Sequence, residues 1–127
     1  SPTSPNQLRD NVKLSHYFPD HREAATTLRV KDLEHELRRH PRRPLMMNVP
    51  AMQLDFDLFP VGEEFAVLSR NLSASGIAIV HTQSLVGKIA VLIELPEIGQ
   101  VQLLLRIVRC KKVGQLYEMG GAFFDRR

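Results

Sequence analysis

The sequence predicts an all-β fold, a six-stranded antiparallel barrel that follows a helix and a flexible N-terminal arm. The chain has 127 residues, of which 43% are hydrophobic, so it is long and apolar enough to bury the core of one domain. Beyond Pro50, short apolar runs recur between glycine and proline turns, which is typical of barrels and sandwiches. The helical pattern precedes these runs instead of alternating with them, and this order disfavours an α/β fold.

Residues 1–19 are expected to form a flexible N-terminal segment. They contain three prolines and show no clean periodicity of apolar residues. They also lack the apolar stretch of a secretory signal, and nowhere does the chain reach the roughly 20 apolar residues that a membrane-spanning helix needs. We therefore expect a cytoplasmic protein without membrane insertion.

A helix is expected over residues 20–37. Asp20 and Glu23 have the spacing of a capping box, in which each side chain bonds an amide at the start of the helix. Thr27 is a second candidate for the capping residue, because two consecutive threonines weaken a helix that starts earlier. Three leucines then form a partial apolar stripe. Pro41 ends the helix, since it has no amide proton and disfavours helix in the residue before it.

The strands are expected in the domain that spans residues 38–127, which includes an arginine-rich arm. From Met52 to Leu58, apolar and polar residues alternate strictly, and this alternation predicts a strand with one buried face. The turns between strands contain glycine or proline, which favour chain reversal. The six expected strands span residues 52–58, 65–69, 76–80, 88–95, 101–109 and 116–124.

The residue types that support catalysis or metal binding do not form a recognisable set. Cys110 is the single cysteine, which excludes an internal disulfide and a cysteine-rich zinc site. The five histidines lack metal-ligand spacing, and Ser73 and Ser75 have no arrangement of histidine and aspartate near them in sequence. Asp55 and Asp57 are expected to face solvent from one strand. We therefore expect no catalytic residue, no metal and no cofactor, and the chain is predicted not to be an enzyme.

Two polar clusters remain as candidate binding residues. The formal net charge is +3, and residues 38–43 contribute four arginines and no acid, so the rest of the chain is nearly neutral. One dense group of arginines suits a small anionic ligand better than a nucleic acid, which usually needs a basic face spread over a domain. The second cluster is the polar turn before the strand expected at 76–80. The candidate residues are Arg38, Arg39, Arg42 and Arg43 in the first cluster, and Asn71, Ser73 and Gly76 in the second.

The two clusters together resemble the signature of the PilZ family. Its members carry an Arg-x-x-x-Arg motif before the first strand and, about 20 to 30 residues later, an Asp/Asn-x-Ser-x-x-Gly motif. Here Arg42 and Asn71 lie 29 residues apart. The dipeptide Val108-Arg109 and the closing Gly121-Ala-Phe123 are also similar to the family. The resemblance covers roughly residues 36–125.

The arginines form two overlapping Arg-x-x-x-Arg pairs. One pair is Arg38 with Arg42, and the other is Arg39 with Arg43. Because members of the family commonly read Arg-x-x-Pro-Arg, the resemblance favours the first pair and gives the second a supporting role.

The resemblance implies a receptor for the bacterial second messenger cyclic di-GMP. A guanidinium fork matches both the O6/N7 edge of guanine and the oxygens of a phosphate, and its flat face stacks on a purine. Asn71 is expected to bond a guanine edge and Ser73 to reach a phosphate, while Gly76 lets the backbone approach the ligand. Binding is expected to order the arginine arm against the barrel and so to pass the signal to a partner protein.

Two other functions are open to a chain with this pattern. Arginines at a helix end are often a solvated face, and Asn, Ser and Gly are common turn residues, so the chain could be a PilZ-like protein-interaction module that binds no nucleotide. A barrel that binds single-stranded nucleic acid needs aromatic stacking platforms, and 6% aromatic residues disfavour this function. We therefore expect neither DNA nor RNA as a partner.

Overall fold

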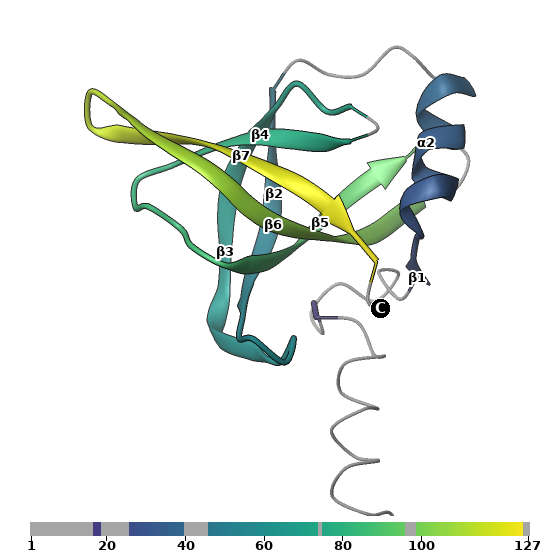
Figure 1. The fold of residues 1–127 in the computed structure, drawn as a ribbon, viewed down its shortest axis with the longest axis horizontal. Helices are drawn as coiled ribbons and strands as arrows, with labels where there is room; N and C mark the ends of the chain where they lie inside the picture. The colour runs from purple at the N-terminus through teal and green to yellow at the C-terminus, as the bar shows by residue number, and fades with distance from the viewer. Residues whose placement is uncertain (1–16, 19–25, 40–45, 74, 96–98, 126–127) are drawn as a thin grey trace, which may run out of the picture.

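The computed structural model describes residues 17–18, 26–39, 46–73, 75–95 and 99–125 (Figure 1). Six strands form a closed antiparallel barrel in the order β6-β5-β2-β3-β4-β7, and β7 pairs back with β6. The predicted six-stranded antiparallel barrel is therefore confirmed. The elements are β1 (Thr26–Thr27), α2 (Val30–Arg39), β2 (Met46–Leu54), β3 (Pro60–Arg70), β4 (Gly76–His81), β5 (Lys88–Leu95), β6 (Gly99–Val113) and β7 (Leu116–Phe124).

The strands β5 and β7 have the predicted bounds, whereas β2 begins earlier than its alternating pattern indicated. The expected strand started at Met52, where the strict alternation of apolar and polar residues begins. In the structure, β2 pairs with β5 only from Ala51 to Leu54, so at Pro50 its sole sheet neighbour among the described strands is β3. A proline is tolerated where one side of the strand has no partner.

The strand β2 also ends before Leu58, and the expectation of a strand through Leu58 was wrong. The Asp55 carboxylate accepts hydrogen bonds from the amides of Asp57 (2.8 Å) and Phe59 (2.9 Å), which fixes a turn between β2 and β3. Leu58 adopts a positive φ of 70° within this turn. Asp55 is thus a turn residue whose carboxylate accepts backbone hydrogen bonds. Asp55 and Asp57 do not lie on one face of a strand, as had been expected.

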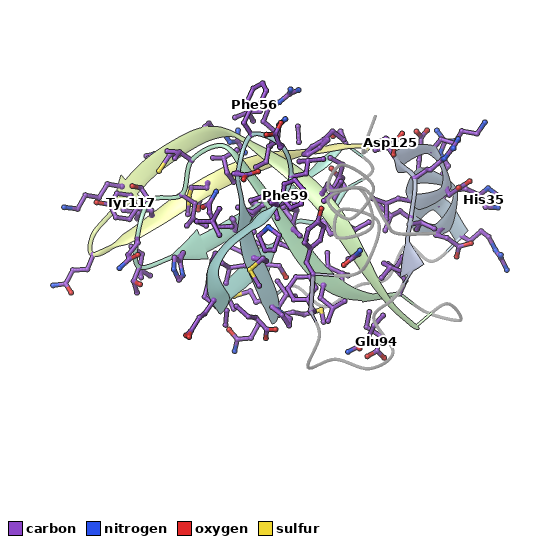
Figure 2. The ribbon with its side chains drawn as sticks, turned by 90° about the horizontal axis from the view of Figure 1, so that it is seen from below. His35, Phe56, Phe59, Glu94, Tyr117 and Asp125 are labelled. Carbon is purple, nitrogen blue, oxygen red and sulfur yellow. The ribbon has the colours of Figure 1, made fainter. Side chains whose placement is uncertain are left out.

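The helix α2 begins at Val30, later than the predicted start. Residues Thr26–Thr27 form β1 instead, which pairs in parallel with Val101 and Gln102 of β6. This is the strand preference of β-branched residues, supported by a free position beside β6. The proposed capping pair Asp20 and Glu23 lies outside the described residues. The first helical amide, that of Val30, donates to Oδ1 of Asp125 at 2.8 Å, so a carboxylate from the end of β7 caps the helix. Figure 2 shows Asp125 beside α2.

The helix α2 ends at Arg39, in agreement with the helix-stopping effect of Pro41. Arg38 and Arg39 therefore lie in the last helical turn, and the expectation that they belong to a flexible arm was wrong. A cation in the last turn of a helix interacts favourably with the helix dipole. Among the described residues, no helix is long and apolar enough to cross a membrane.

The core fills the barrel and is closed at one end by α2. Leu33 and Leu37 of α2 are buried and belong to the same apolar cluster as the inward side chains of the barrel strands. The helix contributes these two side chains at a spacing of four residues, which places them on one helix face. Figure 1 shows α2 beside the barrel, at the end where β5 terminates.

A second apolar cluster lies on the outer side of β2, β5 and β6. Tyr17 and Phe18 are buried there, against outward side chains such as Leu92 and Leu104. The Tyr17 amide donates to the buried Gln102 side chain (2.7 Å), and the Tyr17 hydroxyl donates to the carbonyl of Leu58 (2.8 Å). The expected flexible segment 1–19 is therefore fixed to the barrel at these two residues, because an aromatic pair covers apolar surface and its polar atoms have partners.

Replacement of Leu33 by alanine is expected to lower the free energy of unfolding by about 2–5 kcal/mol, because a fully buried leucine is removed from the end of the core. The matched control is Leu116→Ala, since Leu116 is 42% exposed and its loss leaves no cavity. Urea denaturation of both variants measures the difference. Equal losses in the two variants would contradict the role given to α2.

Candidate functional site

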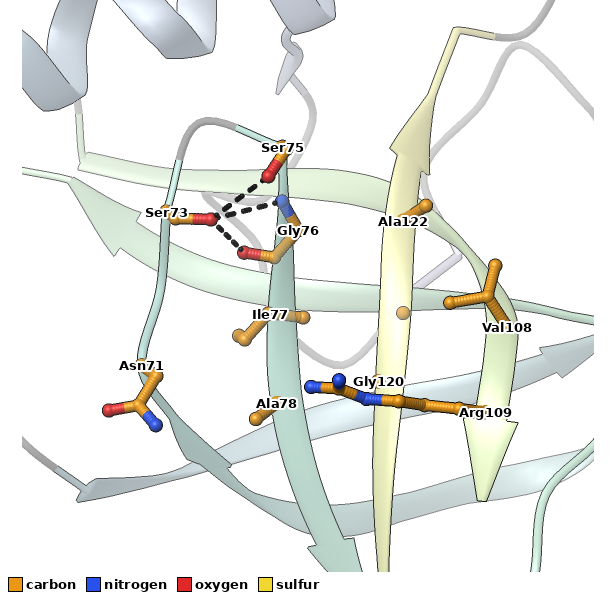
Figure 3. Close-up of a pocket in the computed structure, with 11 residues that line it drawn as sticks. Asn71, Ser73, Ser75, Gly76, Ile77, Ala78, Val108, Arg109, Gly120 and Ala122 are labelled. Carbon is orange, nitrogen blue, oxygen red and sulfur yellow. Dashed lines mark hydrogen bonds between the residues drawn. The ribbon is translucent and has the colours of Figure 1, made fainter.

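A pocket of about 320 Å³ lies on the outer surface of the barrel, where the loop that leads into β4 meets β7 and β6 (Figure 3). The loop supplies Asn71, Ser73 and Ser75, β6 supplies Val108 and Arg109, and the floor is formed by β4 and β7. The sheet therefore brings together three segments that are far apart in the chain. The cavity falls at the lower end of the volumes that small-molecule sites occupy.

Asn71 ends β3 and turns the chain into the loop. Its φ is 44°, a left-handed conformation that asparagine adopts more readily than most residues. Its side chain lines the pocket, and Figure 3 shows the amide group at the opposite end of the loop from Ser75. The backbone conformation of Asn71 thus forms the turn, while its side-chain amide is accessible to a ligand in the pocket.

Ser73 holds the loop against the start of β4. Its amide donates to the Gly76 carbonyl at 2.9 Å, and its hydroxyl accepts from the Gly76 amide at 3.3 Å. The same hydroxyl oxygen lies 3.1 Å from the Gly76 carbonyl and 3.3 Å from the hydroxyl of Ser75 (Figure 3). The loop is therefore fixed by its own hydrogen bonds, and a ligand would meet a pre-formed edge.

Gly76 is required by the close approach of β4 and β7. A Cβ atom at this position would lie 2.2 Å from the carbonyl oxygen of Gly121, a backbone atom that cannot move aside cheaply. In the register, Gly76 is opposite Ala122 and Ile77 is opposite Gly121. The glycine of the motif therefore has a packing reason in addition to the proposed ligand contact.

Arg109 is the site residue that the sequence analysis did not single out for binding. The register between β6 and β7 shifts between Ile107 and Arg109, so Val108 is the extra residue of a β-bulge. A bulge bends the strand and re-aims the next side chain. As a result Val108 and Arg109 both line the pocket, although neighbouring residues of a regular strand face opposite sides.

The side chain of Arg109 lies across the strand β7 over Gly120. A Cβ atom at Gly120 would lie 2.5 Å from Nε and 3.0 Å from Cγ of Arg109, so the absence of a side chain makes room for the arginine. Figure 3 shows the guanidinium extending over β7 toward Ala78. Ala78, Gly120 and Ala122 in the lining have a small side chain or none, which leaves space beside the planar cation.

The charge of this pocket is positive. Within the described part of the chain, Arg109 has no ion-pair partner, and no carboxylate lines the pocket. The acid nearest in the β7 sequence, Glu118, is paired with Arg70 at 2.7 Å. An uncompensated guanidinium at a concave surface favours an anionic ligand or one with a planar hydrogen-bonding edge.

The structure brings Asn71, Ser73 and Gly76 together in the pocket, as their spacing led us to expect, but it does not place Arg38 or Arg39 among the lining residues. Arg38 is paired with Glu34, and Arg39 lies 3.7 Å from a carboxylate oxygen of Glu36. Each pair joins residues about one helical turn apart, and the pair of Arg38 with Glu34 is exposed to solvent, where such ion pairs are weak. Arg42 and Arg43 lie outside the described residues.

The loop that contains Ser73 and Ser75 nevertheless faces the helix. In Figure 1 the loop enters β4 at the end of the strand nearest α2, and Figure 3 shows α2 beyond Ser73. The arginine-bearing end of α2 is followed in the sequence by Arg42 and Arg43, and the chain then enters β2 at Met46. Arg38 and Arg39, in the last turn of α2, thus belong to the same end of the molecule as the polar loop.

No protein-family model matches the chain, and no curated protein matches it.

Replacement of Gly76 by alanine is expected to lower the free energy of unfolding by about 1–3 kcal/mol, because the added methyl group collides with the Gly121 carbonyl. The matched control is Gly120→Ala, where the added methyl group meets only the flexible side chain of Arg109. Urea denaturation should show a smaller loss for the control. A Gly76→Ala variant as stable as the wild type would contradict the close approach of β4 and β7.

Proposed function

We propose that this chain is a PilZ-type receptor domain that binds cyclic di-GMP in the pocket between the Asn71–Gly76 loop and the β6–β7 pair. The observation that carries the proposal is the convergence of the polar motif and of an arginine without an ion-pair partner among the described residues on one cavity. Asn71, Ser73 and Gly76 come from the motif, and Arg109 faces them from the opposite side, with no acid among the described lining residues.

The chemistry of Arg109 suits a guanine nucleotide. A guanidinium donates two parallel hydrogen bonds to the O6/N7 edge of guanine or to a phosphate, and its flat face also stacks on a purine ring. The small residues Ala78, Gly120 and Ala122 leave space for a planar base beside it. Lysine offers only a point charge, so the planar fork is the feature that favours guanine over a simple anion.

The polar loop supplies the complementary groups. Asn71 carries a donor and an acceptor that suit the edge of a base, and the hydroxyl of Ser75 lies beside that of Ser73 at the loop tip. Gly76 presents its backbone without a side chain, so a ligand can approach closely. These groups would form hydrogen bonds with the uncharged parts of the nucleotide, while the arginines neutralise its phosphates.

The arginine cluster of residues 38–43 would cover the nucleotide from the side of α2. The ion pair of Arg38 with Glu34 is solvent-exposed, with 77% of the Arg38 side chain accessible, so exchange of the carboxylate for a phosphate costs little. Reordering of Arg42 and Arg43 around the ligand would change the surface that a partner protein meets. This reordering is the proposed means of signal transmission.

A protein-interaction module without nucleotide is the second candidate. It is favoured by the structural roles of two motif residues. Ser73 stabilises the turn through its hydrogen bonds to Gly76, and Gly76 is needed for strand packing, so neither residue requires a ligand to explain its presence. The turn and the packing do not account for the unpaired guanidinium of Arg109 in the same cavity. For that reason we place the nucleotide receptor first.

Isothermal titration of the full chain with cyclic di-GMP tests the proposal, with GTP as the control ligand. Saturable heat with cyclic di-GMP alone is the expected result, and its stoichiometry separates one bound nucleotide from two. Absence of heat, together with an unchanged melting temperature at high ligand concentration, would favour the protein-interaction module, because a ligand specific for the native state must raise its stability.

Replacement of Arg109 by alanine is expected to weaken binding about ten- to a hundredfold, the effect of losing one charged set of hydrogen bonds worth about 1.5–3 kcal/mol. Arg109→Lys should lose nearly as much, because it keeps the charge but not the fork. Arg106→Ala is the matched control, since Arg106 is exposed on the same strand but does not line the pocket. Titration of the three variants measures the effect, and wild-type affinity in Arg109→Ala would rule out this pocket.

A further inference from the structure

The strand β6 is longer than its neighbour β5, and this leaves part of it with one partner. The pairing with β5 ends at Arg106, opposite Lys88, and the amide of Ile107 still donates to the Gly87 carbonyl at 2.8 Å. From Val108 to Val113, β7 is the only sheet partner of β6 among the described residues. Six residues of β6 thus form an open strand edge of roughly 20 Å.

Nothing among the described residues covers this edge. All six residues are exposed, including two valines, Val108 at 59% and Val113 at 52%. Leu116, opposite Val113 across the turn, is also 42% exposed. Figure 1 shows the β6–β7 hairpin extending beyond the other strands. Such an edge presents unpaired backbone N–H and C=O groups and can accept a further strand.

The edge is positively charged, which favours an acidic partner. Arg109, Lys111 and Lys112 lie within the six residues, and the acid opposite Lys111, Glu118, is already paired with Arg70. Two copies of this edge would bring like charges together, which disfavours self-association. An added strand that carries carboxylates would instead place opposite charges across the new ladder.

We propose that the β6 edge from Val108 to Val113 is a docking site for an extended acidic segment of a partner protein, which adds as a strand beside β6. Backbone hydrogen bonds along the edge would fix the register of the added strand. Its carboxylates would pair with Lys111 and Lys112, which lie on opposite faces of the sheet. Apolar residues of the segment would contact Val113 and Leu116. The proposal does not require nucleotide binding, although Arg109 belongs to both sites and would link them.

The probe for the test is a fluorescein-labelled peptide of sequence Val-Glu-Val-Glu-Glu-Val-Glu, titrated with the full chain while anisotropy is measured. Two control peptides separate the contribution of charge from that of backbone hydrogen bonds. One has lysine in place of each glutamate, and the other keeps the glutamates but is N-methylated at every amide. We expect binding of the acidic peptide alone. Hydrogen exchange should slow in residues 108–113 when it binds, because added-strand hydrogen bonds protect those amides.

Charge reversal on the edge provides the matched variants. Lys111→Glu with Lys112→Glu should weaken the acidic peptide about tenfold and create binding of the lysine peptide. Arg29→Glu with Lys31→Glu makes the same change in net charge at exposed positions near the start of α2, and should leave both peptides unaffected. Neither pair of residues lines the nucleotide pocket, so nucleotide titration of the same variants keeps the two proposals separate.

Three outcomes would overturn the proposal. Binding of the N-methylated peptide with wild-type affinity would show attraction of charges without strand addition. Protection of residues 108–113 that rises with protein concentration in the absence of peptide would show that the edge pairs with a second copy. Binding to vesicles of anionic phospholipid that depends on Lys111 and Lys112, with no response to the acidic peptide, would assign the edge to a membrane surface.

Discussion

The pairing of β6 with β7 closes the barrel, and the position of the candidate site depends on it. This pairing joins β6 and β7, which are the two ends of the six-stranded order. It encloses the core that Leu33 and Leu37 cap from α2. Because the closure is antiparallel and contains a bulge at Val108, it also decides which β6 side chains face outward.

Two glycines make this closure possible at the point where the pocket forms. Gly121 faces the core, where a Cβ would lie 3.3 Å from Cβ of Leu105, and Gly120 faces outward beneath Arg109. Gly76 then lets β4 approach β7 from the other side. The same small residues that allow three strands to pack closely leave a shallow cavity on the surface, and the arginine lies over it. The small residues at these positions therefore determine both the packing of the barrel and the geometry of the site.

The barrel could be predicted from the sequence because strand patterns and turn residues act locally. β5 is bounded by Gly87 and Pro96, and its apolar run has the length of a strand. Features that arise from tertiary pairing could not be predicted. Thr26 and Thr27 were assigned to a helix, but they form β1 because β6 offers a position beside them. The turn at Asp55 resembled a continued strand because its polar residues happen to alternate with apolar ones.

The loop residues of the site could be predicted, since Asn71, Ser73 and Gly76 lie within six consecutive positions of one motif. Arg109 could not be assigned to them, because alternation along β6 does not reveal a bulge, and the bulge decides where the arginine lies. Arg38 and Arg39 were expected in an arm because they precede Pro41, yet the helix continues through them. The site is thus a local motif completed by a long-range contact.

A nuclear magnetic resonance titration of the ¹⁵N-labelled chain with cyclic di-GMP tests directly whether this pocket is a nucleotide site. We expect the perturbed amides within the barrel to belong to residues 71–78, to Arg109 and to Gly120–Ala122, the three segments that meet at the pocket. The opposite end of the barrel, including the turn at Asp55, should remain unchanged. Absence of perturbation, or perturbation confined to residues outside these segments, would contradict the assignment of the pocket as a nucleotide site.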